Sequence, residues 1–326
     1  MSGRSWDYQL YGLRLRTDRE LPGLAALPPW GMADVTVTLA GNGGDPFPVP
    51  VSSWLHDLPP FPVWKAACPD GTYVRLRYAS ENDEMEFVLG PGGRRVWVSW
   101  SDHLLLEDVS SILFGPVLTC LAMLRGKTCL HGSVIALADR ALAILGASGA
   151  GKSTLALACI RRGARLVSDD LVLLEEVPAG FAARCGSPAL RLRPQTAEAL
   201  WGSFESLRPI WSSPRAARYK RYLDLAGNDA GGQSAVPLAA IIVLGSRLPG
   251  AETASFEPLP PAPALATLMA HRPADFLSDR EGHVRDFALL SRLASRIPIN
   301  RLCWPDGFEG LDLLSERVLT ECCPRA

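Results

Sequence analysis

Hydrophobic and polar residues follow a strand-like pattern over about the first 103 residues. Short segments there alternate apolar and polar residues, or are rich in β-branched and aromatic residues, as strands are. These segments are Trp6–Leu15, Asp34–Leu39, Thr72–Tyr78, Met85–Leu89 and Arg94–Trp100. Proline-rich stretches, such as residues 46–50 and 58–62, separate them. We therefore predict a β-rich N-terminal domain over residues 1–103, serving as a substrate-binding module, an oligomerisation module or a cover for a second sheet.

From residue 104 onward, longer apolar runs alternate with segments of helical periodicity. Residues 104–124 predict a helix that links the two parts of the chain. Buried strands are expected at Ala141–Leu145 and Leu238–Leu244. The other expected elements are the helices Gln195–Trp201, Ala264–His271, Arg285–Arg296 and Leu311–Leu319 and the strand Ile297–Trp304. Residues 104–326 thus predict an α/β domain with a mixed sheet, and the whole chain is α+β.

Composition narrows the classes of partner. The 326 residues carry a net charge of −1 and are 48% hydrophobic, which is typical of a globular chain without a bulk basic surface. We therefore expect no nucleic-acid partner. The apolar tract at 112–124 is too short to span a bilayer, and the N-terminus has no apolar signal segment. No membrane association and a cytoplasmic location are expected, with the eight cysteines reduced.

A glycine-rich loop lies between the predicted strand Ala141–Leu145 and a helical segment. Its residues, Gly146, Ala147, Ser148, Gly149, Ala150, Gly151, Lys152 and Ser153, match G-x-x-x-x-G-K-[ST] and are followed by Thr154. In this motif, backbone N–H groups and the helix N-terminus bind phosphates, the lysine reaches the β- and γ-phosphates, and the serine hydroxyl binds Mg²⁺. The alternative is an ordinary Gly/Ser turn before a helix. The strand–loop–helix order favours nucleotide binding.

Two adjacent acids, Asp169 and Asp170, separate two apolar runs that follow this helix. Taken alone, they would be a polar turn between strands. In nucleotide-binding proteins of this loop type, an acid near the loop completes the Mg²⁺ site, which favours a functional role. A basic stretch at 212–222 contains Arg215, Arg218, Lys220 and Arg221. It is either a solvated face or a group of side chains that binds phosphate or substrate.

Together these segments resemble the catalytic core of HPr kinase/phosphorylase. In that family an H-G pair precedes a G-D-S-G-x-G-K-S loop, and R-G-H-R-L-V-A-D-D follows the loop helix. Here the matching residues are His131-Gly132, the loop Gly146–Ser153, and Arg162 to Asp170. The remaining C-terminal segments are similar to HPr-kinase-like proteins of lasso-peptide biosynthesis clusters. Those segments are Leu190–Pro194, Lys220–Tyr222 and Leu268–Arg272.

The resemblance implies an HPr-kinase-like, phosphoenolpyruvate-carboxykinase-like fold for the C-terminal domain and an ATP- and Mg²⁺-dependent serine kinase. The implied acceptor is a peptide or protein hydroxyl, such as the C-terminal Ser of a lasso-peptide precursor. One of Asp169 and Asp170 is implied as the base, with Asp170 favoured, and the other holds the metal or orients a neighbouring group. Ser153 is a further metal ligand, and His131 and Lys152 lie beside the pair. Candidate phosphate or substrate clamps are Arg191, Arg215, Arg218, Lys220 and Arg221. A homo-oligomer is also implied.

The chain departs from the family pattern at two positions. Ala147 replaces the acid after the first loop glycine, and Ala164 replaces the histidine of R-G-H-R. The family's metal-binding Glu segment and phosphorolysis loop have no clear counterpart, so kinase activity is expected and phosphorylase activity is not. A small-molecule kinase and a nucleotide-gated NTPase or regulator remain the alternatives.

Overall fold

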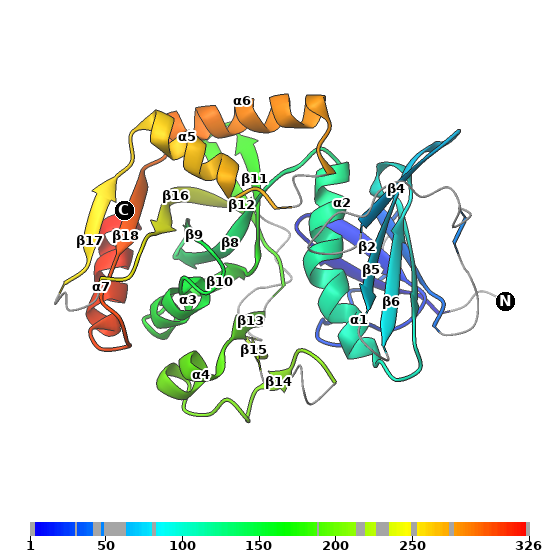
Figure 1. Cartoon of the computed structure of the whole chain (residues 1–326), viewed down its shortest axis with the longest axis horizontal. Coiled ribbons are helices and arrows are strands. Elements are labelled where there is room, and N and C mark those ends of the chain that lie inside the picture. Colours follow the sequence, from blue (N-terminus) through cyan, green and yellow to red (C-terminus); the bar gives the residue numbers. More distant parts are fainter. Residues whose placement is uncertain are drawn as a thin grey trace. The chain divides into compact units, whose positions relative to one another are not determined.

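The computed structural model describes residues 4–29, 31–41, 47–48, 63–79, 83–187, 189–212, 219–225, 235–248, 253–273 and 277–323. The chain forms two compact units (Figure 1). The first comprises Met1–Gly126 and Ile210–Pro214, and the second comprises Lys127–Pro209 and Arg215–Ala326. The boundary therefore falls at Gly126, whereas the sequence pattern places it at residue 103. The first unit is β-rich and the second is mixed α/β, and each has its own sheet.

The first unit contains a sheet with the strand order β1-β2-β3-β7-β6-β5-β4. The strands are β1 Trp6–Leu10, β2 Leu13–Thr17, β3 Val35–Leu39, β4 Val63–Cys68, β5 Gly71–Ala79, β6 Glu84–Leu89 and β7 Arg95–Trp100. The prediction of one strand over Trp6–Leu15 is wrong. Tyr11 and Gly12 have φ values of 54° and 75°, so the chain reverses there and β1 and β2 pair as a hairpin. The other predicted strands of this part are confirmed within two residues.

The predicted helix at 104–124 is observed as α1 Leu106–Ile112, a π-helical turn at Leu113–Val117 and α2 Leu118–Leu124. Pro116 lies in the π-helical turn, where it interrupts the regular hydrogen-bond pattern. The helix groups with the first unit. By length and composition, Leu106–Leu124 is long and apolar enough to cross a membrane, but 72% of that window is buried inside the protein, as in a core helix.

The second unit is built around a mixed sheet with the order β10-β8-β11-β12-β16-β18-β17, and β9 pairs with both β8 and β16. Its strands are β8 Thr128–Leu137, β9 Arg140–Leu145, β10 Arg165–Ser168, β11 Leu171–Val177, β12 Gly180–Arg184, β16 Ala235–Leu244, β17 Ser255–Pro258 and β18 Ile299–Cys303. A separate small sheet contains β13 Ala189–Leu192, β15 Arg221–Asp224 and β14 Arg208–Pro209. Strands β9 and β18 both run parallel to β16. The carboxyl ends of these three strands therefore meet at one edge of the sheet.

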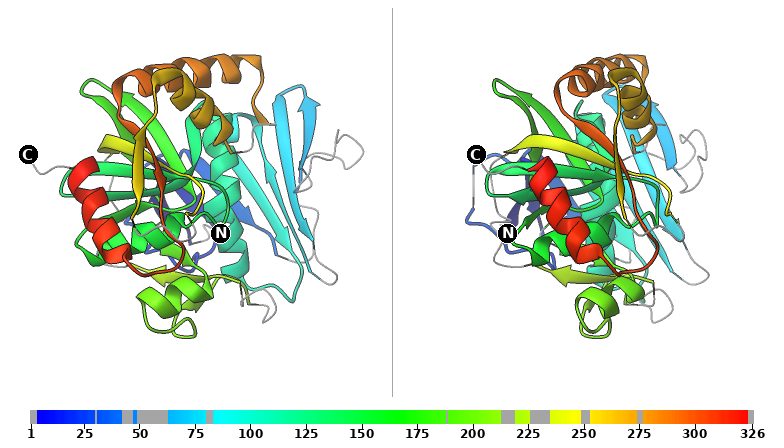
Figure 2. Two further views of the ribbon diagram at one scale, coloured as in Figure 1. Left: turned by 60° about the vertical axis from the view of Figure 1, so that its left-hand side comes forward. Right: turned by 90° about the vertical axis from the view of Figure 1, so that its left-hand side faces the viewer.

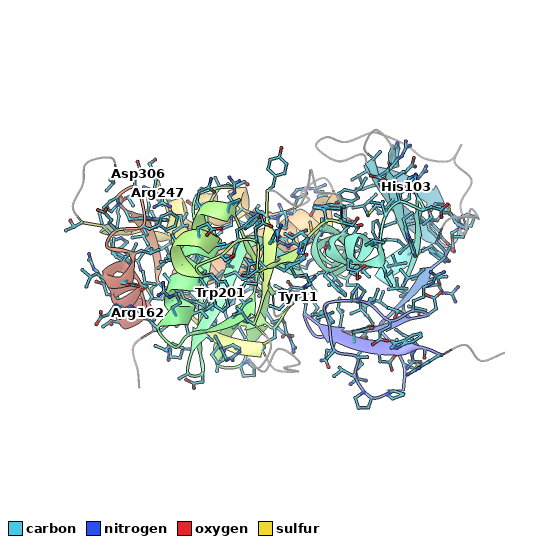
Figure 3. All side chains as sticks on the ribbon, turned by 90° about the horizontal axis from the view of Figure 1, so that it is seen from below. Tyr11, His103, Arg162, Trp201, Arg247 and Asp306 are labelled. Carbon is cyan, nitrogen blue, oxygen red and sulfur yellow. The ribbon has the colours of Figure 1, made fainter. Side chains whose placement is uncertain are left out.

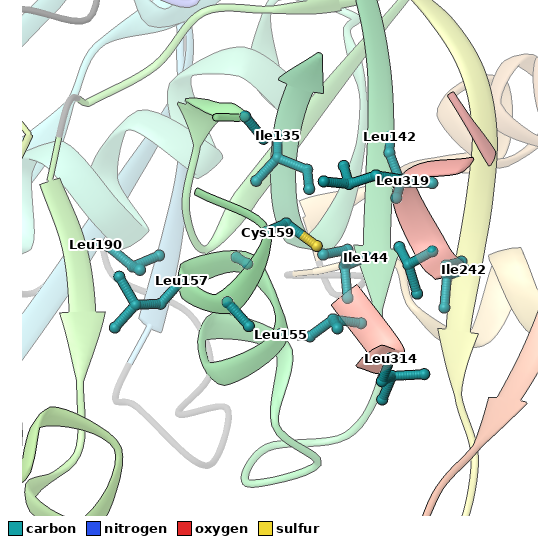
Figure 4. Close-up of a cluster of buried hydrophobic side chains, with 14 of the residues drawn as sticks. Ile135, Leu142, Ile144, Leu155, Leu157, Cys159, Leu190, Ile242, Leu314 and Leu319 are labelled. Carbon is teal, nitrogen blue, oxygen red and sulfur yellow. The ribbon is translucent and has the colours of Figure 1, made fainter. Parts of the chain in front are cut away.

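Helix α3, Lys152–Arg161, follows β9 and is buried on its apolar side. Leu155, Leu157 and Cys159 pack against residues of the sheet and of helix α7, Leu311–Cys322 (Figure 4). The other helices are α4 Pro194–Leu200, α5 Pro261–Ala270 and α6 Arg280–Arg296. Helices α5 and α6 lie side by side against the opposite face of the sheet from α3 (Figure 2). The predicted C-terminal helices and strand are thus confirmed in type and order, with shifted ends.

Candidate active site

The glycine loop connects the end of β9 to the start of α3. Gly149 and Gly151 have φ values of 84° and 105°, in the left-handed region that favours glycine. The Lys152 side chain folds back over this loop, and its Nζ donates to the carbonyl oxygens of Gly146, at 2.9 Å, and Ala147, at 3.1 Å. Lys152 is only 8% exposed. Ser153 and Thr154 lie in the first turn of α3, where backbone N–H groups have no intrahelical partner.

Asp169 and Asp170 form the turn between β10 and β11. The two oxygens of Asp169 are both engaged, because Oδ1 accepts from the Ser133 hydroxyl at 2.6 Å and Oδ2 accepts from the Arg191 backbone N–H at 2.9 Å. Asp170 forms an ion pair with the guanidinium of Arg191, and its side chain is 26% exposed. Its φ of 67° is unusual for a residue other than glycine, although aspartate tolerates it. Asp170 is the more accessible of the two carboxylates.

His131 lies in β8 and is hydrogen-bonded to the turn that contains the two aspartates. Its Nδ1 is 3.0 Å from the carbonyl oxygen of Asp170, and its backbone N–H donates to the His271 carbonyl oxygen at 2.7 Å. A carbonyl oxygen can only accept, so this contact places the proton on Nδ1 and leaves Nε2 as an acceptor. Burial lowers the pKa of His131, and the charge of Lys152 lowers it further. The imidazole is therefore neutral near pH 7.

The environments of the two aspartates push their pKa values in opposite directions. Burial raises the pKa of Asp169, and the neighbouring charge of Asp170 raises it further. Burial also acts to raise the pKa of Asp170, but the charge of Arg191, followed by Lys220, by His131 when it is protonated, and by Lys152, brings it below the usual value. Burial lowers the pKa of Lys152, against the attraction of both carboxylates. These groups thus share one electrostatic environment.

The candidate clamp residues lie in different places. Arg191 and Lys220 are near the aspartates, as their effects on Asp170 require. Arg221 instead pairs with Glu205, donates to the carbonyl oxygens of Glu205 and Leu207, and stacks over Phe204. Arg215 and Arg218 lie outside the described residues.

Two arginines that the sequence pattern does not single out lie against the glycine loop. A Cβ atom added at Gly149 would be 3.8 Å from a guanidinium nitrogen of Arg193. One added at Gly151 would be 2.7 Å from a guanidinium nitrogen of Arg247. Arg193 is two residues after Arg191 in the sequence, whereas Arg247 follows a strand almost 100 residues beyond the loop. The position of Arg247 shortly after a predicted buried strand is the sequence feature that could have indicated a role in the site.

The residues present fit a nucleotide with Mg²⁺. No group of three or more His, Cys, Asp or Glu side chains that could hold a metal occurs among the described residues. Mg²⁺ is commonly bound through one or two carboxylates and substrate phosphates, with the remaining positions taken by water. Ser153 and Asp169 would supply such oxygen ligands, and the loop N–H groups and Lys152 would neutralise phosphate charge. When bound, Mg²⁺ would offset the charge that develops on the phosphates.

Comparisons with known proteins place this geometry in context. Residues 122–187 match the family model of the HPr Serine kinase C-terminal domain. HPr kinase/phosphorylase of Clostridium perfringens strain SM101 is 33% identical over 91 residues, covering 28% of this chain and 28% of that protein. The enzyme of Clostridium botulinum strain Eklund 17B is 34% identical over 91 residues, covering 28% of this chain and 29% of that protein. The Hpr(Ser) kinase/phosphatase structure from Coxiella burnetii aligns with a TM-score of 0.31 and 17% identity, covering 60% of this chain and 95% of that chain.

The sequence matches support a relationship between the segment that carries the glycine loop and the HPr kinase/phosphorylase family. The matched segment contains His131, the whole loop and both aspartates. It spans less than a third of the length of the curated relatives.

Proposed function

We propose that this protein is an ATP-dependent kinase that phosphorylates a hydroxyl group of a peptide or protein. The observation that carries the proposal is the grouping of Lys152, Asp169, Asp170 and His131 in one electrostatic environment beside the glycine loop. Phosphoryl transfer depends mainly on positioning and charge stabilisation, and this arrangement supplies both. The match to the HPr Serine kinase C-terminal domain supports the same class of reaction.

In the proposed reaction, the backbone of residues 147–152 holds the phosphates of ATP. Lys152 would leave the loop carbonyls to contact the β- and γ-phosphates, and Ser153 and Asp169 would hold Mg²⁺. The acceptor hydroxyl gives its proton to Asp170 as its oxygen forms a bond to the γ-phosphorus and the bond to ADP breaks. A low pKa for Asp170 is compatible with this role, because a loose transition state needs an oriented carboxylate more than a strong base.

The exposure of the two carboxylates supports this division of roles. Asp169 is 8% exposed, and its two oxygens are occupied by Ser133 and the Arg191 backbone. Asp170 is more exposed and is held on one oxygen by the Arg191 guanidinium. An incoming hydroxyl therefore reaches Asp170 more readily than Asp169. Arg191 would shift toward the transferred phosphoryl group as Asp170 takes the proton.

For the acceptor, we propose a short precursor peptide of the lasso-peptide type with a C-terminal serine. A free C-terminal carboxylate next to the reacting hydroxyl would suit the cations beside Asp170, because arginine binds carboxylates through two parallel hydrogen bonds. Arg191 and Lys220 are two described cations whose charges act on Asp170.

The test is incubation of the protein with Mg²⁺, ATP and peptides that end in serine, followed by mass measurement. The proposal expects a gain of one phosphate on the peptide. Asp170→Asn should retain ATP binding and lose transfer by at least about 100-fold, since a positioned base contributes that much. Release of phosphate from ATP with no phosphorylated peptide or protein would indicate an NTPase. Phosphate gain on a metabolite fraction alone would indicate a small-molecule kinase.

A further inference from the structure

The edge of the sheet that carries the glycine loop continues beyond it to two other strand ends. β16 runs parallel to both β9 and β18, with Val243 opposite Leu145 and Leu244 opposite Leu302. The residues that follow these strands are therefore neighbours: Gly146 after β9, Gly245–Arg247 after β16 and Trp304 after β18. Ligands of α/β sheets bind at the carboxyl ends of parallel strands. The segments after β16 and β18 are thus in position to contact a ligand held by the loop.

Arg247 is held in place beside the loop by contacts with the segment after β18. Its guanidinium carbon lies 3.8 Å from the centre of the Trp304 ring, and its Nη1 donates to the Pro305 carbonyl oxygen at 3.2 Å. The backbone is joined as well, because Leu248 N donates to Trp304 O at 3.0 Å. Trp304 itself is 3% exposed and packs in the core around α3. Burial lowers the pKa of Arg247, and the charge of Asp306, which lies near it in Figure 3, opposes that effect.

The charge of Arg247 lies beside other positive groups, which Asp306 offsets and a bound anion would offset further. Gly151 is the N-cap of α3, so Arg247 lies next to the positive end of the helix dipole. Lys152, which follows Gly151, adds a buried cation. The stacking and hydrogen-bond partners of Arg247, the Trp304 ring and the Pro305 carbonyl, are both uncharged. A phosphate at the loop would reverse this repulsion.

The position of Arg247 relative to the aspartates indicates which part of the ligand it contacts. β9 pairs with β8 on one side and with β16 on the other. The strands β8 and β11 on the first side carry His131 and border Asp170. Arg247 and Trp304 follow strands on the second side. If the γ-phosphate faces the acids, the nucleoside half of ATP extends toward Arg247.

We propose that Arg247, stacked on Trp304, binds the ribose and α-phosphate half of the nucleotide whose outer phosphates the glycine loop holds. This inference rests on the proposed nucleotide site. Lys152 serves the transferred end of ATP, and Arg247 serves the end that stays with ADP. Arg247 accordingly makes the site prefer a nucleotide to a bare phosphate chain.

The test compares the Kd values of ATP, ADP and inorganic pyrophosphate, which can fill the two outer phosphate positions alone, for the full chain, measured by calorimetry with Mg²⁺. Arg247→Gln should weaken ATP and ADP binding by about 10-fold, the effect of losing one charge-assisted contact, and pyrophosphate binding by less than about 3-fold. Arg247→Lys keeps the charge but cannot stack as a plane, so its Kd values for ATP and ADP should lie between those of the wild type and of Arg247→Gln. Arg292→Gln removes an exposed arginine that pairs with Glu176 and should leave every Kd unchanged.

Each other outcome has a distinct meaning. An unchanged ATP Kd in Arg247→Gln, with the wild-type protein binding ATP, would overturn this inference and leave the proposed kinase function standing. An equal loss for ATP and pyrophosphate would also overturn it, because Arg247 would then act as a general charge. Wild-type protein that binds neither ATP nor ADP would overturn the proposed function together with this inference. Circular dichroism at the measuring temperature shows whether Arg247→Gln is folded.

Discussion

Arg191 holds Asp170 through its guanidinium while its own backbone N–H donates to Asp169 Oδ2 at 2.9 Å. One residue of β13 thus fixes both acids of the turn that follows β10. Its guanidinium also lies 5.5 Å from the centre of the Tyr222 ring on β15. The small sheet that contains β13 and β15 therefore positions the carboxylates, and substitutions at Arg191 should act on Asp170 first.

Arg191→Met should raise the pKa of Asp170 and reduce the stability gained from its ionised form. We expect the free energy of unfolding at pH 7 to fall by about 2 kcal/mol, less than for a fully buried ion pair, because both side chains are partly exposed. A carboxylate with a lowered pKa stabilises the protein above its unfolded-state pKa and loses that effect as the pH falls through its folded-state pKa. The difference between variant and wild type should therefore shrink in acid, as measured by urea unfolding at several pH values. A constant difference would show that Arg191 acts by packing alone.

Ser133→Ala should destabilise the protein through Asp169, and this cost should also shrink in acid. The hydroxyl donates to Asp169 Oδ1 at 2.6 Å and lowers a pKa that burial has raised. Without this hydroxyl, the free energy of unfolding at neutral pH should fall by about 1–2 kcal/mol, because ionised Asp169 loses a hydrogen-bond donor. A carboxylate with a raised pKa destabilises the protein most above its folded-state pKa, and protonation relieves this cost as the pH falls. Thermal unfolding from pH 8 to pH 4 should show the variant approaching the wild type; divergence toward acid would contradict this account.

Gly151→Ala should be more harmful than Gly163→Ala, although both glycines have φ values near 100°. At Gly163, where φ is 95°, an added Cβ meets no atom within 4 Å, so we expect only the backbone cost of about 1–2 kcal/mol. At Gly151 the Cβ would also lie 2.7 Å from Arg247 and 3.0 Å from Trp304. We expect a further loss of about 1–3 kcal/mol and a distorted loop. Unfolding curves of the two variants provide the comparison, and equal losses would show that Arg247 moves aside freely.

Arg272→Met should be among the most destabilising substitutions in the second unit. Arg272 and Asp286 are 3% and 5% exposed and form an ion pair at 2.9 Å, and Thr128 donates to the other oxygen of Asp286. Removing the arginine leaves the buried carboxylate with only the more distant Arg285, at 4.0 Å, as a described counter-charge, which we expect to cost about 3 kcal/mol. Arg292→Gln, which breaks the exposed pair with Glu176, should cost no more than about 1 kcal/mol. Chemical unfolding measures both, and a loss below 1 kcal/mol in Arg272→Met would refute the expectation.

Arg272→Met should also disturb the candidate site. His271 precedes Arg272, and its carbonyl oxygen accepts the backbone N–H of His131 at 2.7 Å. A shift of this segment would move His131 relative to Asp170. If the variant remains folded, we expect its transfer activity to fall with little change in ATP affinity, because the segment of Arg272 contacts His131, which lies beside Asp170. A loss of ATP affinity instead would indicate a wider rearrangement.

Local sequence was sufficient for the loop and for the type of most elements. The apolar strand before Gly146 and the helix after Gly151 are short-range patterns, and each is observed where it was predicted. The reversal at Tyr11-Gly12 was missed because the alternation of polar and apolar residues runs through it without a proline or a strong turn pair. The position of the acids after the loop could also be predicted from the sequence. Asp169 and Asp170 follow the loop by one helix and one short strand, so they are close to it in the chain.

The sequence by itself determined the chemical inventory: a phosphate-binding pattern, a lysine, two adjacent carboxylates and a histidine. The tertiary structure decided which side chains act on them, because those contacts join residues far apart in the chain. It assigned Ser133 and the Arg191 backbone to Asp169, the Arg191 guanidinium to Asp170, and Arg247 with Trp304 to the far side of the loop. Strand pairing brings these positions together, and no local periodicity of the sequence encodes which strand ends become neighbours.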